Sequence, residues 1–316
     1  MKVLVTGGAG FIGSHVAEAL SSAGSEVLVL DDLSTGKREN VPPRAGFERI
    51  DLRDAAAVKN AVLAFRPDAV SHQAAQASVS VSVRDPRLDV AVNVIGSLNL
   101  LEACAEAGVA RVIFASTGGA IYGEVPEGQR ATEDAPARPL SPYAISKLAV
   151  EQLLEVFRLH RGLEYGVLRY ANVYGPRQDP HGEAGVIAIF MQALLEGRPL
   201  RVNARRTSGD GGCIRDYVFV ADVVRANLAA LRGKLPARVL NVASGAATTT
   251  AELAETIFEL VARRSELLMA GPRAGDLERS VLNPERCAEL LGTPTALATG
   301  LAATWNWYVQ SSRTRA

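Results

Sequence analysis

The chain has few of the residues that build disulfide frameworks or metal centres. Its 316 residues include only three cysteines and four histidines. The cysteines, Cys104, Cys213 and Cys287, are far apart and odd in number, which argues against a disulfide framework and favours a reducing compartment. The histidines are scattered along the sequence rather than clustered at the spacing of metal ligands, so we expect no metal.

Excess charge and long apolar runs are also absent. Lys and Arg together number 34, as do Asp and Glu, so opposite charges balance. A neutral chain has no bulk attraction to nucleic acid or to an anionic membrane, and we expect neither as a partner. We find no run of about 18 apolar residues to span a bilayer. The first predicted strand begins at Lys2, which leaves no room for a signal peptide, so we expect a cytoplasmic protein.

Hydrophobic residues make up 48% of the chain, enough at this length to bury a large core. Apolar segments of strand length alternate with helical patterns, which is typical of a parallel sheet with helices on both faces. The fold class is therefore α/β, a doubly wound Rossmann sheet with a smaller α/β lobe. The predicted strands lie near residues 2–6, 26–30, 46–50, 68–71, 111–115 and 165–170.

The first strand runs directly into a glycine-rich turn and a helix. Residues 2–13 read KVLVTGGAGFIG, in which Gly8, Gly10 and Gly13 form the pattern G-x-G-x-x-G. Glycines let the backbone approach a pyrophosphate closely, and the N-terminus of the next helix stabilises the phosphate charge. The segment predicts a dinucleotide site. Its expected contacts are Gly7, Gly10, Phe11, Ile12 and Gly13.

Three further strand ends carry residues suited to the same ligand. Asp31 lies about 20 residues past the last glycine, where an acid accepts hydrogen bonds from the adenosine ribose. Asp51 and Leu52 follow the third strand and are expected near the adenine, although Asp51 by itself reads equally well as a solvated loop carboxylate. After the fourth strand, the small residues in Gln73-Ala74-Ala75 let the backbone pass close to a flat ligand.

Hydroxyl groups and a Tyr/Lys pair follow the fifth strand. Ser116 and Thr117 end that strand, at the sheet edge where ligands of open α/β folds bind. Lys147 stands four residues after Tyr143 in the next predicted helix, so the two side chains share a helical face. Tyrosine is a weak base because its pKa is about 10, but a nearby ammonium group favours the phenolate and lowers that pKa. The pair predicts acid–base chemistry.

Together these segments resemble the extended short-chain dehydrogenase/reductases, and within them the NAD-dependent nucleotide-sugar epimerases typified by UDP-glucose 4-epimerase. The resemblance covers nearly the whole chain. It rests on residues 6–13 (TGGAGFIG), Asp31, 51–54 (DLRD), Asn93, Ser116-Thr117, 143–147 (YAISK), 168–176 (LRYANVYGP), 215–218 (RDYV) and 273–276 (RAGD).

The resemblance implies a 4-epimerase that interconverts UDP-glucose and UDP-galactose through a 4-keto sugar, with NAD as a bound cofactor. Thr117 would polarise the 4-oxygen of the sugar, Tyr143 would act as the base, and Lys147 would hold the nicotinamide ribose. Asn93 would join the cofactor site. The implied substrate contacts are Asn172, Arg215 and Arg273 at the diphosphate, Asp276 at the nucleoside ribose and Ser280 at the hexose.

Departures from the family pattern leave alternatives open. One extra residue in Gly118-Gly119 leaves it undecided whether Ser116 or Thr117 faces the sugar. The related sugar dehydratases carry Asp-Glu directly after the catalytic threonine, so the two glycines weigh against dehydration. The alternatives are a 4-epimerase of UDP-glucuronate or UDP-N-acetylglucosamine, or a non-catalytic NAD-sensing protein, which would need neither Tyr143 nor Lys147.

The sequence also predicts a domain division and an assembly. We expect a dinucleotide-binding domain of residues 1–171 plus about 216–243, and a substrate-binding lobe of about 172–215 plus 244–316. Two predicted helices, Pro86 to Gly108 and Tyr143 to His160, carry more apolar surface than packing on a sheet uses. As in the resembling family, we expect them to pair with their copies in a homodimer.

Overall fold

The computed structural model describes residues 1–181, 185–273 and 275–315 and divides into two compact units. The first consists of Met1–Thr117, Pro139–Arg169 and Val224–Leu240. The second consists of Gly118–Arg138, Tyr170–Val223 and the chain from Asn241 onward, so the 118–138 segment groups with it. Residues 182–184 lie outside the described residues, as does Ala274 of the RAGD segment.

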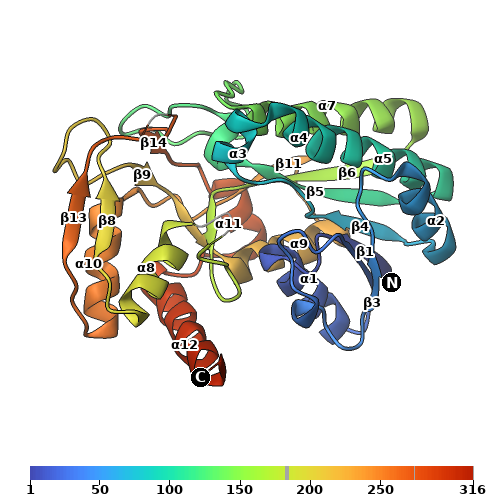
Figure 1. Ribbon diagram of the computed structural model, residues 1–316. Helices are drawn as coiled ribbons and strands as arrows, with labels where there is room; N and C mark the ends of the chain where they lie inside the picture. Colours follow the sequence, from blue (N-terminus) through green and yellow to red (C-terminus); the bar gives the residue numbers. More distant parts are fainter. Residues whose placement is uncertain (182–184, 274, 316) are drawn as a thin grey trace. The chain divides into compact units, whose positions relative to one another are not determined.

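A seven-stranded sheet forms the centre of the fold, in the order β11-β6-β5-β4-β1-β2-β3 (Figure 1). Strand β1 pairs with β2 and β4, β2 with β3, and β4 with β5, all in parallel. This arrangement confirms the predicted doubly wound α/β fold. The strands are β1 (Lys2–Thr6), β2 (Glu26–Asp31), β3 (Gly46–Arg49), β4 (Ala69–His72), β5 (Arg111–Thr117), β6 (Glu164–Tyr170) and β11 (Val239–Val242).

Helices cover both faces of this sheet. Helices α2, α5 and α7 pack side by side on one face, while α1 and α9 lie on the other (Figure 1). The helices are α1 (Phe11–Ser22), α2 (Ala55–Phe65), α3 (Val79–Arg84), α4 (Pro86–Val90), α5 (Gly96–Ala107), α7 (Pro142–Arg161) and α9 (Val220–Leu231), with a short 3₁₀ turn η1 (Arg38–Asn40). The side chain of Asp54 caps α2 by accepting from the Ala57 N–H at 3.0 Å.

The strand order creates a switch point beside β1. From β1 the chain adds β2 and β3 on one side, and β4, β5, β6 and β11 on the other. Ligands of open α/β sheets bind at the carboxyl ends of the strands where the order reverses. At those ends the chain places Gly7 after β1, Asp31 at the end of β2, Gln73 after β4 and Thr117 at the end of β5.

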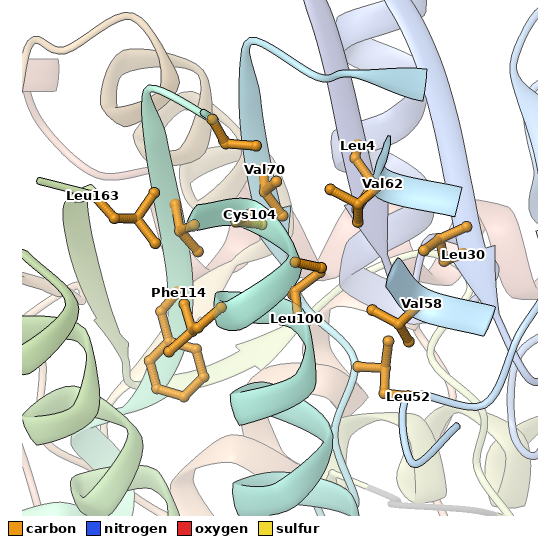
Figure 2. Packing of buried hydrophobic residues seen from close by; sticks show 14 of the residues in the cluster. Leu4, Leu30, Leu52, Val58, Val62, Val70, Leu100, Cys104, Phe114 and Leu163 are labelled. Atoms are coloured by element: carbon orange, nitrogen blue, oxygen red, sulfur yellow. The ribbon is translucent and has the colours of Figure 1, made fainter. Parts of the chain in front are cut away.

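The core of the first unit lies between the sheet and the α2, α5 and α7 layer. Figure 2 shows Leu4, Val62, Val70, Leu100 and Phe114 packed together, and all five are essentially solvent-free. Cys104 belongs to the same cluster, and burial raises the pKa of its thiol to about 12, so it acts as a small apolar side chain.

The predicted long helix from Pro86 contains a change of helical type. Between α4 and α5 the chain forms one π-helical turn, η2 (Ala91–Ile95), which the sequence pattern did not reveal. The whole stretch Pro86–Ala107 is long and apolar enough to cross a membrane, contrary to our expectation that no such stretch exists. Core helices of globular proteins pass the same test, and Leu100 and Leu101 are fully buried here.

The second unit has its own core and three small sheets, paired as β7–β10, β12–β9–β14 and β8–β13. Tyr174, Phe190, Met191, Leu253 and Ile257 are the centre of the core. Its strands are β7 (Asn172–Tyr174), β8 (Leu200–Asn203), β9 (Ile214–Arg215), β10 (Tyr217–Phe219), β12 (Thr248–Thr249), β13 (Leu267–Ala270) and β14 (Arg279–Ser280). Its helices are α6 (Gly118–Ile121), α8 (Val186–Leu195), α10 (Thr250–Val261), α11 (Glu285–Leu291) and α12 (Leu297–Arg315).

Candidate functional site

The β1–α1 turn is packed so closely that side chains are excluded at two glycines. Gly7 has φ +67°, and a Cβ there would lie 2.6 Å from the Ala74 nitrogen. A Cβ on Gly13 would lie 2.1 Å from the Gly7 carbonyl oxygen. Helix α1 begins at Phe11, and its N-cap residue Gly10 has no side chain to bond the first N–H groups. The turn therefore fits a pyrophosphate, which those N–H groups would bind.

Asp31 is fixed at the end of β2 beside this turn. Its carboxylate accepts from the backbone N–H of Ala9 at 2.9 Å and of Leu33 at 2.8 Å. Burial raises the pKa of the Asp31 carboxyl, and the two backbone hydrogen bonds oppose that rise. A carboxylate can accept about four hydrogen bonds, so this one retains capacity for the hydroxyls of a ribose.

Asp51 forms a surface ion pair with Arg53. The Arg53 Nε donates to Asp51 Oδ2 at 2.9 Å, and the side chain of Asp51 is 36% exposed. Hydrogen bonding from the guanidinium lowers the pKa of the Asp51 carboxyl. Of the two sequence interpretations of Asp51, the ion pair corresponds to the solvated loop carboxylate, and its contact with an adenine remains a prediction. The neighbouring Leu52 is buried.

A buried hydrogen-bond chain links the glycine turn to the π-turn. Ser97 Oγ donates to the Asn93 carbonyl at 2.5 Å, so it must accept from His72 Nε2, 2.8 Å away. His72 Nδ1 is then the acceptor for the Thr6 hydroxyl at 2.7 Å. Burial, aided by the charge of Lys147, lowers the pKa of His72 to about 3, so the imidazole is neutral. This series of hydrogen bonds sets the place where β1, β4 and α5 meet.

Tyr143 and Lys147 lie on one face of α7, as their spacing predicted. The Lys147 Nζ lies 5.9 Å from the centre of the Tyr143 ring and 4.7 Å from that of Phe114. Lys147 is 3% exposed, and its ammonium group donates to the Ala115 carbonyl at 2.9 Å. Ser141 caps the helix by accepting from the Ala144 N–H. The ammonium group is thus held between α7 and the end of β5.

The two hydroxyl residues at the end of β5 have different surroundings. Ser116 Oγ donates to Glu151 Oε1 at 2.6 Å, and Glu151 is itself held by Arg169 Nη2 at 2.6 Å. All three groups are buried. Within the described part of the chain, no hydrogen-bond partner is found for the Thr117 hydroxyl. Ser116 is therefore committed to an internal ion pair, whereas Thr117 is available to a ligand.

The second unit contains a cavity of about 350 Å³ lined by four of the predicted substrate residues, Asn172, Arg215, Arg273 and Asp276. Arg273 Nη2 and Asp276 Oδ1 form an ion pair at 2.7 Å. The hydrogen bonds that Arg273 donates to Asp276 raise the pKa of the Arg273 guanidinium, so its positive charge is secure. The cavity can therefore offer two guanidinium groups to a diphosphate.

Asp216 supports the backbone that lines this cavity. Its carboxylate accepts from the Ser244 hydroxyl at 2.6 Å and from the backbone N–H of Gly245 and Leu282. Its carbonyl accepts from the Asn172 amide at 3.1 Å. Because Asp216 is adjacent to Arg215 and bonds Asn172, these hydrogen bonds fix the backbone at two of the predicted substrate contacts, Asn172 and Arg215.

Ser280 is not among the described residues that line the cavity. It is 2% exposed on β14, where it is the register partner of Arg215 on β9. The sequence reasoning missed five polar residues that do line it, Gln178, Arg201, Asn203, Tyr217 and Thr250. The usable signal was the alternation in β8, since Arg201 and Asn203 are two residues apart on one strand and their side chains bond at 3.0 Å.

Comparison with known proteins agrees with this geometry. Residues 3–243 match the model of the NAD dependent epimerase/dehydratase family. The chain belongs to this family. It is 43% identical to a UDP-glucose 4-epimerase from Mycolicibacterium smegmatis, over 99% of this chain and 100% of the relative.

Two solved structures are also similar to this chain. One is the Thermus thermophilus UDP-glucose 4-epimerase in complex with NAD, with 54% identity, a TM-score of 0.93, and coverage of 98% of this chain and 99% of that one. The other is the Thermotoga maritima UDP-glucose 4-epimerase with UDP-glucose, with 44% identity, a TM-score of 0.92, and coverage of 99% and 100%. Both match over essentially their whole length.

The buried neutral imidazole of His72 predicts an acid-dependent loss of stability. Its pKa is about 6.5 when unfolded and about 3 when folded, so between these values the unfolded chain binds the extra proton. The contribution of His72 is complete above pH 6.5 and declines as the pH falls toward 3. In urea unfolding at a series of pH values, the stability advantage of wild type over His72→Gln should shrink on acidification. An advantage that stays constant across this range would contradict the assignment.

Proposed function

We propose that this chain is an NAD-dependent UDP-glucose 4-epimerase that interconverts UDP-glucose and UDP-galactose. The observation that carries the proposal is the Tyr143/Lys147 pair on α7, beside the strand end that presents the unbonded Thr117 hydroxyl. A glycine turn that excludes side chains and a carboxylate at the end of β2 supply the features of an NAD site. The whole-length likeness to UDP-glucose 4-epimerases supports the choice of substrate.

In this proposal the cofactor is held at the carboxyl ends of the strands of the central sheet. The first N–H groups of α1, with Gly7, Gly10, Phe11, Ile12 and Gly13, meet the pyrophosphate, and Asp31 accepts from the adenosine ribose. NAD, when bound, supplies the acceptor and then the donor for the hydride from sugar carbon 4. The remaining contacts are Asp51, Leu52, Gln73, Ala74, Ala75, Asn93, Tyr143 and Lys147.

The proton is handled by Tyr143. The phenolate oxygen removes the proton of the sugar 4-hydroxyl as the 4-hydrogen leaves, and returns it after the opposite face is reduced. The ammonium group of Lys147 would favour the phenolate by electrostatic attraction. Thr117 donates a hydrogen bond to the same sugar oxygen, because Ser116 is occupied by Glu151.

Inversion requires the diphosphate to be held tightly and the sugar loosely, so that the 4-keto sugar can present either face. Asn172, Arg215 and Arg273 would hold the diphosphate and Asp276 the nucleoside ribose. This division gives the phosphates the strong charge-assisted bonds and leaves the hexose with few contacts.

The structure offers no carboxylate for dehydration directly after Thr117. Gly118 and Gly119 begin the short helix α6, and neither can act as the acid or base that loss of water requires. We therefore favour epimerisation over the dehydratase branch of the family. A protein that only sensed NAD would have no use for the buried lysine beside Tyr143.

Replacing Tyr143 by Phe should lower kcat for UDP-galactose formation by at least about 10²-fold, because the base is removed. Lys147→Ala should have a similar effect and Thr117→Val a smaller one. The matched control is Tyr165→Phe, since the Tyr165 hydroxyl bonds Glu155 instead. A coupled assay for UDP-galactose measures turnover, and heat-denatured wild type should release NAD. Wild-type turnover in Tyr143→Phe would refute the mechanism.

Ser280 is proposed to border the hexose near its 2-substituent and to leave room for an N-acetyl group. We therefore expect measurable epimerisation of UDP-N-acetylglucosamine alongside UDP-glucose. Ser280→Tyr should lower kcat/KM for the N-acetyl sugar about ten- to hundredfold relative to UDP-glucose, because overpacking costs about 1 to 3 kcal/mol. An unchanged ratio of the two kcat/KM values, in a folded variant active on UDP-glucose, would remove Ser280 from this role.

We also propose a cytoplasmic homodimer joined through the two predicted helices, Pro86 to Gly108 and Tyr143 to His160. These helices carry apolar side chains that are 45% to 61% exposed, namely Val90, Ile95, Ile145, Val156 and Leu159. Light scattering should give about twice the 33.4 kDa chain mass. Val156→Asp should shift the mass toward the monomer, whereas Leu268→Asp, on β13 of the second unit, should not. A wild-type monomer at micromolar concentration would contradict the dimer.

A further inference from the structure

The carboxylate of Asp89, on α4, is completely buried and lies outside the chemistry described above. It accepts three hydrogen bonds, all from side chains. Ser146 Oγ donates to Oδ1 at 2.6 Å, while Gln76 Nε2 and Asn93 Nδ2 donate to Oδ2 at 2.8 and 3.0 Å. A buried carboxylate is costly unless its oxygens are bonded, so these donors hold Asp89 in one orientation.

Each donor comes from a different segment of the first unit. Ser146 precedes Lys147 on α7, Gln76 follows the cofactor segment 73–75, and Asn93 lies in the π-turn η2. Asn93 and Gln76 also bond each other twice, since the Asn93 amide accepts from the Gln76 N–H and donates to its carbonyl, both at 2.9 Å. The cofactor segment and the π-turn are thus one rigid piece.

Ser146 is the connection between that piece and the catalytic helix. Its hydroxyl is 1% exposed, and Asp89 is the partner that the structure gives it. Ser146 lies three residues after Tyr143 and one before Lys147, so a shift at Ser146 displaces both. π-turns recur at functional sites, and this one brings Asn93 to the carboxylate that Ser146 also reaches.

We propose that Asp89 is a positioning residue that, through Ser146, holds Tyr143 and Lys147 in register with the cofactor segment. The proposal rests on the proposed function for its catalytic consequence. Misplacing a reacting group by about 1 Å can cost about 10²-fold in rate, so a partial loss of register should lower kcat. The diphosphate residues lie in the second unit, so KM for UDP-glucose should change little.

Ser146→Ala tests this link with little loss of volume. We expect kcat to fall about tenfold, with KM for UDP-glucose within about twofold of wild type. The matched control is Ser82→Ala on α3, since Ser82 is equally buried but its hydroxyl donates to the Val79 carbonyl of its own helix. That control should keep wild-type kcat at a similar change in melting temperature. Wild-type kcat in Ser146→Ala, or an equal loss in both variants, would overturn the proposal.

A conservative substitution at Asp89 tests the effect of its hydrogen bonds separately from the effect of its charge. In Asp89→Asn the amide oxygen can accept from Gln76 and Asn93 while the NH₂ group donates to Ser146, so all three links persist. Asp89→Ala breaks all three. Positioning therefore predicts near-normal kcat for Asp89→Asn and a loss of at least about tenfold for Asp89→Ala. Equal losses in the two variants would show that the charge, rather than the link, is what matters.

Hydrogen exchange supplies a test that does not depend on turnover. In Ser146→Ala, backbone amides of residues 73–78 and 143–147 should exchange faster together, while those of α2 stay unchanged. If wild type lacks epimerase activity, the proposed function fails, yet this measurement still decides the link. An active wild type combined with unchanged exchange in both segments would refute the link alone.

Discussion

The close approach of backbone to backbone at the β1–α1 turn is the constraint on which the rest of the first unit depends. The Gly7 carbonyl occupies the space where a Gly13 side chain would begin, and Gly7 itself abuts the Ala74 nitrogen. This contact sets the separation of β1, α1 and the end of β4. Because β1 lies where the strand order reverses, the turn stands between the ends of β2 and β4, its two neighbours in the sheet.

Polar groups next to this turn are then held by internal partners rather than by water. Thr6, His72 and Ser97 form a chain of hydrogen bonds to the Asn93 carbonyl, and the neutral imidazole protonated on Nε2 satisfies it. In a buried network, each group that lacks a partner costs free energy, so the donors and acceptors specify one arrangement. The first unit therefore orients these groups through its own hydrogen bonds, which suits a reaction that depends on orientation.

The different hydrogen bonding of the Ser116 and Thr117 hydroxyl groups follows from the same principle. Glu151 and Arg169 form a buried ion pair, and the carboxylate accepts the Ser116 hydroxyl as a further donor. Breaking a buried pair is expensive, because it leaves an uncompensated charge. Ser116 therefore links β5 to α7 through an internal hydrogen bond, and the adjacent Thr117 hydroxyl is left open to a ligand.

Local sequence patterns determined several segments of this protein and its fold class. The strand–glycine–helix segment, the acid at position 31 and the four-residue spacing of Tyr143 and Lys147 each depend on neighbours in sequence, so their patterns were readable. The α/β fold followed from the same periodicity, and it is confirmed. The roles assigned to the individual site residues, among them Asp51, Asn93 and Ser280, remain predictions.

Only the tertiary structure decided which long-range partners meet. The hydrogen bond that occupies the Ser116 hydroxyl goes to Glu151, 35 residues further along the chain. The π-turn at Ala91–Ile95 and the bond between Asp89 and Ser146 are likewise absent from any local pattern. A hydroxyl or carboxylate has the same sequence signature whether it is bonded internally or open to a ligand. What separates the two cases is burial and the direction of its hydrogen bonds, which the packed fold alone sets.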